Sequence, residues 1–166
     1  LNINSSGLNG AIYAYGAEFS SNSESLYIST YNDYSSSSSS DNNNPNNHQS
    51  ALLQFDLTAA NIAGSQVTIE SKRGFRSALQ LGPDNKIYKT ESSTYDIGLP
   101  NLSTIEAPNT LGINCNYTPN TISLNGRLAR QGLPPFISSF FSEKIDIIDN
   151  TSTTQNLQLP LCVGEN

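Results

Sequence analysis

Residues 17–29 (AEFSSNSESLYIS) and 79–90 (LQLGPDNKIYKT) decide the fold expected of this chain, because they follow one pattern twice. Allowing one extra residue in the first copy, Phe19 aligns with Leu81, and Leu26-Tyr27 aligns with Ile87-Tyr88. The polar residues between them favour tight turns, and an apolar residue followed by tyrosine suits a strand that is buried on at least one face. The repeat therefore predicts two β-hairpins.

Further strands are expected beside these hairpins. Residues 51–57 place Leu53, Phe55 and Leu57 on one face, and shorter strands are expected at 102–106 and 121–124. A hairpin with an outer strand is the content of one propeller blade, and two copies are too few to close a ring. The expected fold class is therefore all-β, a partial β-propeller of about two blades.

Two stretches depart from this pattern. Residues 34–50 are rich in serine and asparagine and predict a disordered, solvated insertion in a blade region that spans 1–144. A calcium loop using Asp33, Asp41 and Asn42 is the alternative, but the regular acid spacing of such loops is missing.

The C-terminal region predicts a short helix and then a strand. Residues 133–141 carry leucine, isoleucine and phenylalanine at helical spacing behind two prolines, which predicts a helix near 134–142. Its apolar stripe either packs on the sheet or forms an exposed aromatic ligand site. Residues 145–166 read as a polar linker and a trailing strand, and both ends of the chain are expected to be cuts in a longer protein.

Composition narrows the class of protein. Only 13% of residues are charged, and the chain has no Met or Trp and a net charge of −6. Residues 1–71 contain no Lys or Arg, and an acidic front half repels phosphate, so neither nucleic acid nor direct membrane insertion is expected. The small basic group Lys72, Arg73 and Arg76 is interpreted as ordinary surface.

Catalytic constellations are sparse. The single histidine, His48, lies in the serine–asparagine tract and is a poor candidate for a triad, which needs an oriented imidazole. Glu18 and Asp56 are the candidate pair for a carbohydrate-active enzyme, although carboxylates that satisfy turns and strand edges are the favoured interpretation. We expect no enzyme activity, no cofactor and no metal.

Cys115 and Cys162 are the only cysteines. Their spacing does not fit a zinc site, and in an exported protein an even count favours a disulfide. The alternative is that Cys162 pairs with a cysteine elsewhere in a longer protein.

The ordered series of motifs resembles a known family. The stretches 15–20 (YGAEFS), 53–57 (LQFDL), 78–88 (ALQLGPDNKIY) and 132–137 (GLPPFI) are similar to the propeller-type repeats of large secreted Bacteroidetes surface proteins. The resemblance covers about residues 8 to 165. It implies export through type IX secretion, a link to gliding motility, and an immunoglobulin-like or PKD-like module whose first strand lies in 145–166. The serine–asparagine insertion is longer than in the family, and a sorting domain is absent from the sequence.

Together these features predict a non-catalytic structural or binding module of an extracellular, cell-surface multidomain protein. Its expected partners are a protein or glycan at the cell surface and other blades or domains of the same protein. A subunit held within the secretion or gliding apparatus is one alternative, because open sheet edges recruit partners. A carbohydrate-active enzyme domain is the other.

Overall fold

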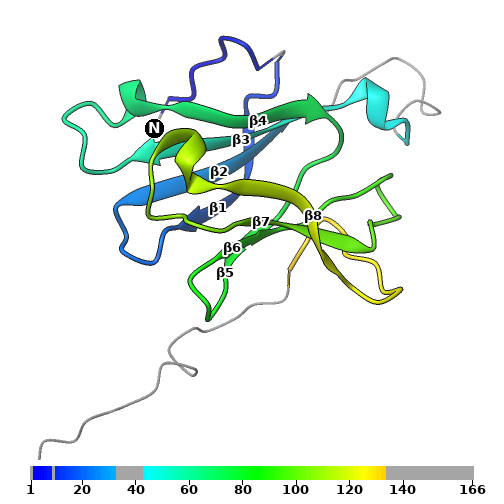
Figure 1. Cartoon of the computed structure of the whole chain (residues 1–166). Coiled ribbons are helices and arrows are strands. Elements are labelled where there is room, and N and C mark those ends of the chain that lie inside the picture. The colour runs from blue at the N-terminus through cyan, green and yellow to red at the C-terminus, as the bar shows by residue number, and fades with distance from the viewer. Residues whose placement is uncertain (1, 9, 33–42, 134–166) are drawn as a thin grey trace, which may run out of the picture.

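The computed structural model describes residues 2–8, 10–32 and 43–133. Within these residues the chain forms two four-stranded antiparallel sheets, and its only helical elements are short 3-10 turns (Figure 1). The all-β prediction is therefore confirmed. The two sheets lie face to face, with sheet A above sheet B in Figure 1, and they do not close into a ring.

Each sheet is a simple meander in which neighbours in sequence are neighbours in space. The strand order is β1-β2-β3-β4 in sheet A and β5-β6-β7-β8 in sheet B. Sheet A contains β1 (Tyr13–Phe19), β2 (Ser25–Asn32), β3 (Gln49–Asp56) and β4 (Val67–Arg73). Sheet B contains β5 (Leu79–Leu81), β6 (Ile87–Lys89), β7 (Asn101–Ile105) and β8 (Tyr117–Ser123). The 3-10 turns are η1 (Pro45–Asn47), η2 (Ala63–Ser65) and η3 (Gly112–Cys115).

The two predicted hairpins are present and equivalent. Phe19 pairs with Leu26 in sheet A, and Leu81 pairs with Ile87 in sheet B. The turns contain residues with positive φ at matching places, Ser23 at 61° and Asn85 at 63°, which is the left-handed region that asparagine tolerates better than most residues. The first turn is one residue longer, as the alignment predicts.

The remaining strands were predicted incompletely. The strands expected at 51–57 and 102–106 match β3 and β7, and the strand expected at 121–124 overlaps the end of β8. Strand β4 was not predicted, and β3 begins at Gln49, inside the tract read as a disordered insertion. Residues 33–42 of that tract, the expected helix near 134–142 and the expected linker and strand in 145–166 all lie outside the described residues.

The central strands of sheet A, β2 and β3, are buried on both faces, because β3 carries apolar residues at successive positions and β2 alternates Leu26 and Ile28 with buried Tyr27. One face packs under the N-terminal segment, in a cluster of Leu8, Ala11, Ile28, Ala51, Leu53 and Phe55. The other face packs on sheet B, in a cluster of Tyr27, Leu52, Leu79, Ile87, Ile105 and Cys115. This second cluster joins the two sheets into one core, because burial of apolar surface is the main favourable term in folding.

Hydrogen bonds between the sheets fix how they stack. Buried Tyr27 donates through Oη to the carbonyl oxygen of Pro108 over 3.0 Å. The Gln54 amide donates to Tyr27 Oη at 2.6 Å and to the Thr110 carbonyl at 2.8 Å, and it accepts from the Gly112 backbone N–H at 2.7 Å. We call Tyr27 and Gln54 the polar clamp, because they hold the loop that follows β7 against sheet A.

The sheets also approach each other closely at β1. A Cβ atom at Gly16 would lie 2.9 Å from the carbonyl oxygen of Ser77 and 3.2 Å from the backbone nitrogen of Leu79. Those two atoms belong to the chain that enters sheet B, so only glycine leaves room for it. Nearby, the Glu18 carboxylate accepts the Leu81 backbone N–H at 3.0 Å.

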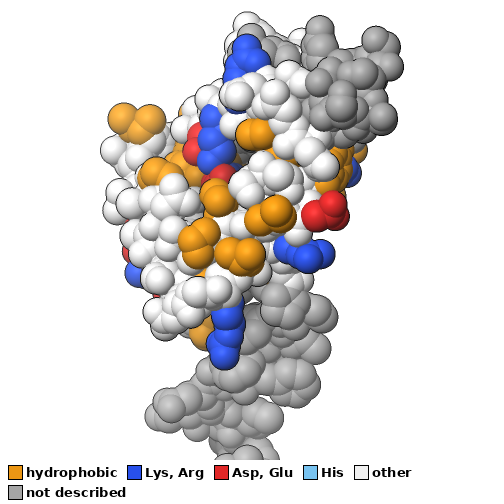
Figure 2. Space-filling model, turned by 90° about the vertical axis from the view of Figure 1, so that its right-hand side faces the viewer, with side chains coloured by type: hydrophobic (Ala, Val, Ile, Leu, Met, Phe, Trp, Pro, Cys, Tyr) orange, Lys and Arg blue, Asp and Glu red, His pale blue; other side chains and the backbone are white. Residues whose placement is uncertain are grey.

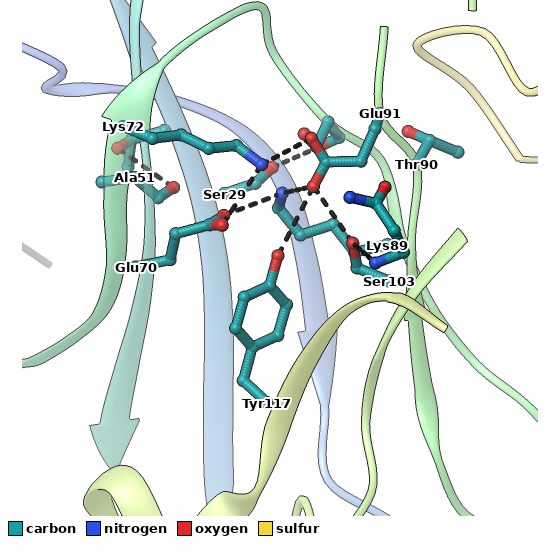
Figure 3. A network of polar contacts seen from close by, with 12 residues as sticks. Ser29, Ala51, Glu70, Lys72, Lys89, Thr90, Glu91, Ser103 and Tyr117 are labelled. Atoms are coloured by element: carbon teal, nitrogen blue, oxygen red, sulfur yellow. Dashed lines mark hydrogen bonds and ion pairs between the residues drawn. The ribbon is translucent and has the colours of Figure 1, made fainter. Parts of the chain in front are cut away.

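A charge network lies between the sheets (Figure 3). The Lys89 ammonium is 2.5 Å from Glu91 Oε1 and 3.1 Å from Glu70 Oε2. The Lys72 ammonium is 2.6 Å from Glu91 Oε2 and 3.2 Å from Glu70 Oε1. Because Glu70 and Lys72 belong to β4 while Lys89 ends β6, the alternating charges join sheet A to sheet B.

Sheet B completes the surroundings of the Glu91 carboxylate. Ser103 and Tyr117 donate to Glu91 Oε1 at 3.2 Å and 3.4 Å. Burial by itself would raise the pKa of Glu91, but the positive charges of Lys89 and Lys72 outweigh it and hold the pKa below its usual value. Glu91 is thus an anion that the folded state stabilises.

We predict that Glu91→Gln lowers the free energy of unfolding by about 3–5 kcal/mol at neutral pH, the usual effect of removing one partner from a buried ion pair. The variant leaves two lysines sharing Glu70. Because the folded-state pKa of Glu91 is lowered, its contribution is complete above the unfolded-state value of about 4.3. The contribution is lost as the pH falls through the folded-state pKa, so the difference between wild type and variant should shrink in acid.

Urea unfolding of both proteins at neutral and acidic pH measures this difference. Glu106→Gln is the matched control, since Glu106 pairs with Lys86 at 2.6 Å and the lysine and glutamate side chains are 36% and 26% exposed. Such a pair contributes at most about 1 kcal/mol. Equal losses in the two variants, or a Glu91→Gln difference that does not change with pH, would contradict this account of the network.

Candidate binding surface

Four tyrosines and an arginine form a cluster that we call the tyrosine surface: Tyr13, Tyr15, Tyr31, Tyr95 and Arg76. The first two belong to β1 and the third to β2, where Tyr13 and Tyr31 are cross-strand partners. Arg76 lies in the connector between β4 and β5, and Tyr95 lies in the loop after β6. The tyrosine surface therefore draws on both sheets.

The Arg76 guanidinium is packed among three of the rings. Its central carbon lies 4.7 Å from the centroid of Tyr31, 5.2 Å from that of Tyr95 and 5.3 Å from that of Tyr15. It also donates to Tyr95 Oη at 3.0 Å. A guanidinium over aromatic faces is attracted by their negative electrostatic potential, so Arg76 holds the rings in fixed positions.

The outer rings of the tyrosine surface are open to solvent. Tyr13 is 57% exposed and Tyr15 is 43% exposed, whereas Tyr31 is partly buried behind them. The Tyr31 ring lies 5.9 Å from Tyr13 and 6.0 Å from Tyr15, the latter edge-on at 90°. The edge-to-face packing of Tyr15 on Tyr31 is a favoured aromatic geometry, whereas Tyr13 packs on Tyr31 at a tilt of 45°. These contacts orient both rings although they face water.

Buried aromatic residues support this arrangement from below. The His48 ring lies 4.5 Å from Phe75 and 5.6 Å from Tyr95, and Phe75 lies 5.2 Å from Tyr95. The sequence placed His48 in a solvated tract, and that expectation was wrong, because His48 is only 3% exposed. Its ring packs against Phe75 and Tyr95.

The connector that carries Arg76 is fixed at several points. Gly74 adopts a φ of 150° and donates to the carbonyl of His48. The Ser29 hydroxyl donates to the carbonyl of Ser77, and Ala78 donates to Thr90 Oγ1 at 2.8 Å. These bonds set the direction in which Arg76 leaves the connector.

The tyrosine surface lies at the end of the molecule where β2 and β4 end and β3 begins, on the right of Figure 1. Figure 2 looks onto this end. Hydrophobic side chains, a class that includes tyrosine in that view, gather in its middle, and basic side chains lie beside them.

The structure gives the candidate catalytic carboxylates ordinary partners. Glu18 Oε1 accepts the Phe19 backbone N–H at 3.0 Å, and its Oε2 accepts from Leu81 in sheet B. Asp56 Oδ1 accepts from the backbone and hydroxyl of Thr58 at 2.8 Å and 2.6 Å, bonds that lower the pKa of Asp56. Both carboxylates thus bind backbone at a strand edge and at a turn, as the favoured interpretation supposed.

The predicted disulfide between Cys115 and Cys162 involves one residue that the structure describes and one that it does not. Cys115 is fully buried in the core between the sheets, and burial raises the pKa of its thiol. Cys162 lies outside the described residues. A disulfide between them stays a prediction.

The basic group read as ordinary surface separates into three different roles. Lys72 belongs to the charge network, the Arg73 guanidinium donates to the carbonyl of Asn46, and Arg76 is held by the tyrosines. Sequence reasoning missed Arg76 because its ring partners come from distant parts of the chain. The alternating tyrosines at 13 and 15 were the available signal.

Among residues 2–8, 10–32 and 43–133, no group of three or more His, Cys, Asp or Glu side chains is arranged to hold a metal ion. Asp33, Asp41 and Asn42, the alternative calcium ligands, lie outside those ranges. No helix in the same residues has the length and hydropathy needed to cross a membrane.

Comparisons of the chain with models of known protein families, with curated proteins and with solved structures found no match.

We predict that Arg76→Met lowers the free energy of unfolding by about 1–2 kcal/mol, because cation–π contacts contribute about 0.5–1 kcal/mol each at exposed sites. Tyrosine circular dichroism in the near ultraviolet should also weaken as the rings lose their fixed positions. Urea unfolding and the dichroism spectrum measure the two effects. Arg127→Met, at an exposed position, is the control and should stay within about 0.5 kcal/mol of wild type. An unchanged spectrum for Arg76→Met would contradict a positioning role.

Proposed function

We propose that this chain is a non-catalytic structural and binding module of a secreted, cell-surface multidomain protein, built from two consecutive propeller-type blades. The tyrosine surface is its contact with a protein or glycan partner. The observation that carries the proposal is the pair of exposed rings, Tyr13 and Tyr15, held in place by Arg76 and Tyr31 on a two-sheet scaffold.

The meander topology supports the blade interpretation. A propeller blade is a four-stranded antiparallel sheet, and successive blades stack face to face. Both sheets here have that strand order, and equivalent hairpins begin them. The resemblance to propeller-type repeats of secreted Bacteroidetes proteins points the same way, and it is the basis for proposing display at the cell surface.

Chemistry supports a binding role for the tyrosine surface. Tyrosine and arginine are enriched among the residues that contribute most to binding, since a large rigid ring buries much area at little entropic cost. Exposed ring faces also pack against the C–H groups of sugar rings, while Tyr hydroxyls and a guanidinium can bond sugar hydroxyls. Because the rings are already oriented, little further ordering is needed when a partner binds.

The carboxylates support a non-catalytic role. Glu18 and Asp56, the enzyme candidates, accept bonds from backbone that they would have to give up to reach a substrate. Glu70 and Glu91 lie between the sheets and neutralise lysines there. A glycosidase instead needs two carboxylates that face each other across a cleft.

Binding to an array of bacterial, algal and plant glycans and to extracellular matrix glycoproteins tests the proposal. We predict that the double variant Tyr13→Ala, Tyr15→Ala weakens the strongest interaction by about thirtyfold or more, the effect of losing about 2 kcal/mol at a hot-spot residue. Ile113→Ala is the matched control, because Ile113 is 85% exposed but lies in η3, on the loop between β7 and β8.

Three outcomes would count against the proposal. They are equal binding by wild type and the double variant, equal loss in the control, and no binding to any member of the array. Release of new reducing ends from a bound glycan would instead favour the enzyme alternative.

A further inference from the structure

The two sheets share a residue-by-residue equivalence that extends beyond the hairpins. In sheet A, Glu18 pairs with Tyr27, and Tyr27 pairs with Gln54. In sheet B, the same register joins Gln80 to Tyr88 and Tyr88 to Thr104. The third and fourth strands of each sheet continue the match. Leu52 pairs with Glu70 in sheet A and Leu102 pairs with Ile122 in sheet B, and each pair lies beside a register shift.

The sheet A members of these pairs form its contact with sheet B. Tyr27 and Leu52 are fully buried in the shared core, and Gln54 belongs to the polar clamp. Glu18 accepts a backbone N–H from β5, and Glu70 neutralises Lys89 of β6. These five positions together are the side of sheet A that receives another sheet.

The equivalent positions of sheet B form its opposite face. Leu79, Ile87 and Ile105 point toward sheet A. Side chains alternate along a strand, so the intervening residues point away from sheet A. We call this set the outer face: Gln80, Tyr88, Leu102, Thr104 and Ile122.

The outer face mixes apolar and polar side chains and carries no sheet among the described residues. Thr104, beside Tyr88, is already fully buried, and its hydroxyl bonds to Glu106 and contacts the hydroxyl of Thr121. Tyr88 and Leu102 are only partly buried, and Ile122 is 38% exposed. Desolvation and a hydrogen bond to Asp84 raise the pKa of Tyr88 to about 12, so its hydroxyl is neutral and compatible with further burial.

We propose that the outer face docks a third four-stranded antiparallel sheet of the same repeat, stacked on sheet B as sheet B is stacked on sheet A. The register match with an interface already formed in this molecule is the reason for naming that occupant. The inference rests on the blade architecture of the proposed function, but it does not depend on ligand binding at the tyrosine surface.

One difference between the faces defines the occupant further. Sheet A presents Glu70 where sheet B presents Ile122, and Glu70 faces buried Lys89. A lysine opposite Ile122 would lose one of its two carboxylate partners, and a buried cation needs such partners. The occupant therefore carries an apolar residue at the position of Lys89, as sheet A itself does with the equivalent Ile28.

A tandem chain tests this inference. A second copy of residues 74–133, which contain sheet B, is joined after residue 166. In this copy Lys89 is replaced by Ile and Glu91 by Thr, because sheet A has Ile28 and Thr30 at the equivalent positions. A thiol probe is introduced in the original part by Ile122→Cys, and labelling is quantified at that peptide. Ile113→Cys, far more exposed and outside the outer face, is the matched probe.

We expect labelling at Ile122→Cys to slow by about tenfold or more in the tandem chain, since a docked sheet must open before the thiol reacts. Labelling at Ile113→Cys should not change. A tandem chain whose copy keeps Lys89 and Glu91 should protect the probe less.

Three results would overturn the inference. They are equal labelling in the single and tandem chains, a copy that stays unfolded by hydrogen exchange, and protection that already grows with concentration in the single chain. The last would assign the outer face to a second copy of this chain. The glycan array, run on the same proteins, reports separately on the tyrosine surface, so failure of one proposal is distinguishable from failure of the other.

Discussion

The ammonium of Lys89 is enclosed between two sheets, and the fold must neutralise it there. A buried cation is tolerated only when carboxylates and hydrogen bonds replace the water it has lost. Glu91 supplies one carboxylate from sheet B at 2.5 Å, and Glu70 supplies the other from sheet A at 3.1 Å. The two sheets are thereby tied at one relative position, because sliding either would leave the lysine with a single partner. The polar clamp and the close approach at Gly16 enforce the same position from other sides.

The tyrosine surface depends on that position. Three of its rings belong to sheet A: Tyr13, Tyr15 and Tyr31. Tyr95 lies in the loop between β6 and β7 of sheet B, and Arg76 lies in the connector between the sheets. The guanidinium contacts rings from both sides only when the sheets are stacked as they are. Oriented aromatic rings on a rigid scaffold are what a binding surface requires, since ordering costs are met during folding and not during binding.

Local features could be predicted from the sequence, and long-range ones could not. The hairpins whose first strands end at Phe19 and Leu81 follow from turn residues and neighbouring apolar pairs, all within a few positions of one another. Strand β4 was missed because Glu70 and Lys72 look solvated in sequence, and only the partners on sheet B make that face partly buried. Arg76 was read as surface charge, and His48 as part of a solvated tract, for the same reason: their aromatic neighbours are distant in the chain.

Hydrogen exchange under increasing urea tests most directly the central claim that the two sheets form one interlocked unit. The amide of Leu53 reports on the centre of sheet A, and that of Ser103 reports on the centre of sheet B. If the buried charges and the polar clamp tie the sheets together, both amides exchange through the same opening, with the same free energy and the same dependence on urea. Exchange of Ser103 through a separate opening of lower free energy, while Leu53 stays protected, would contradict the account.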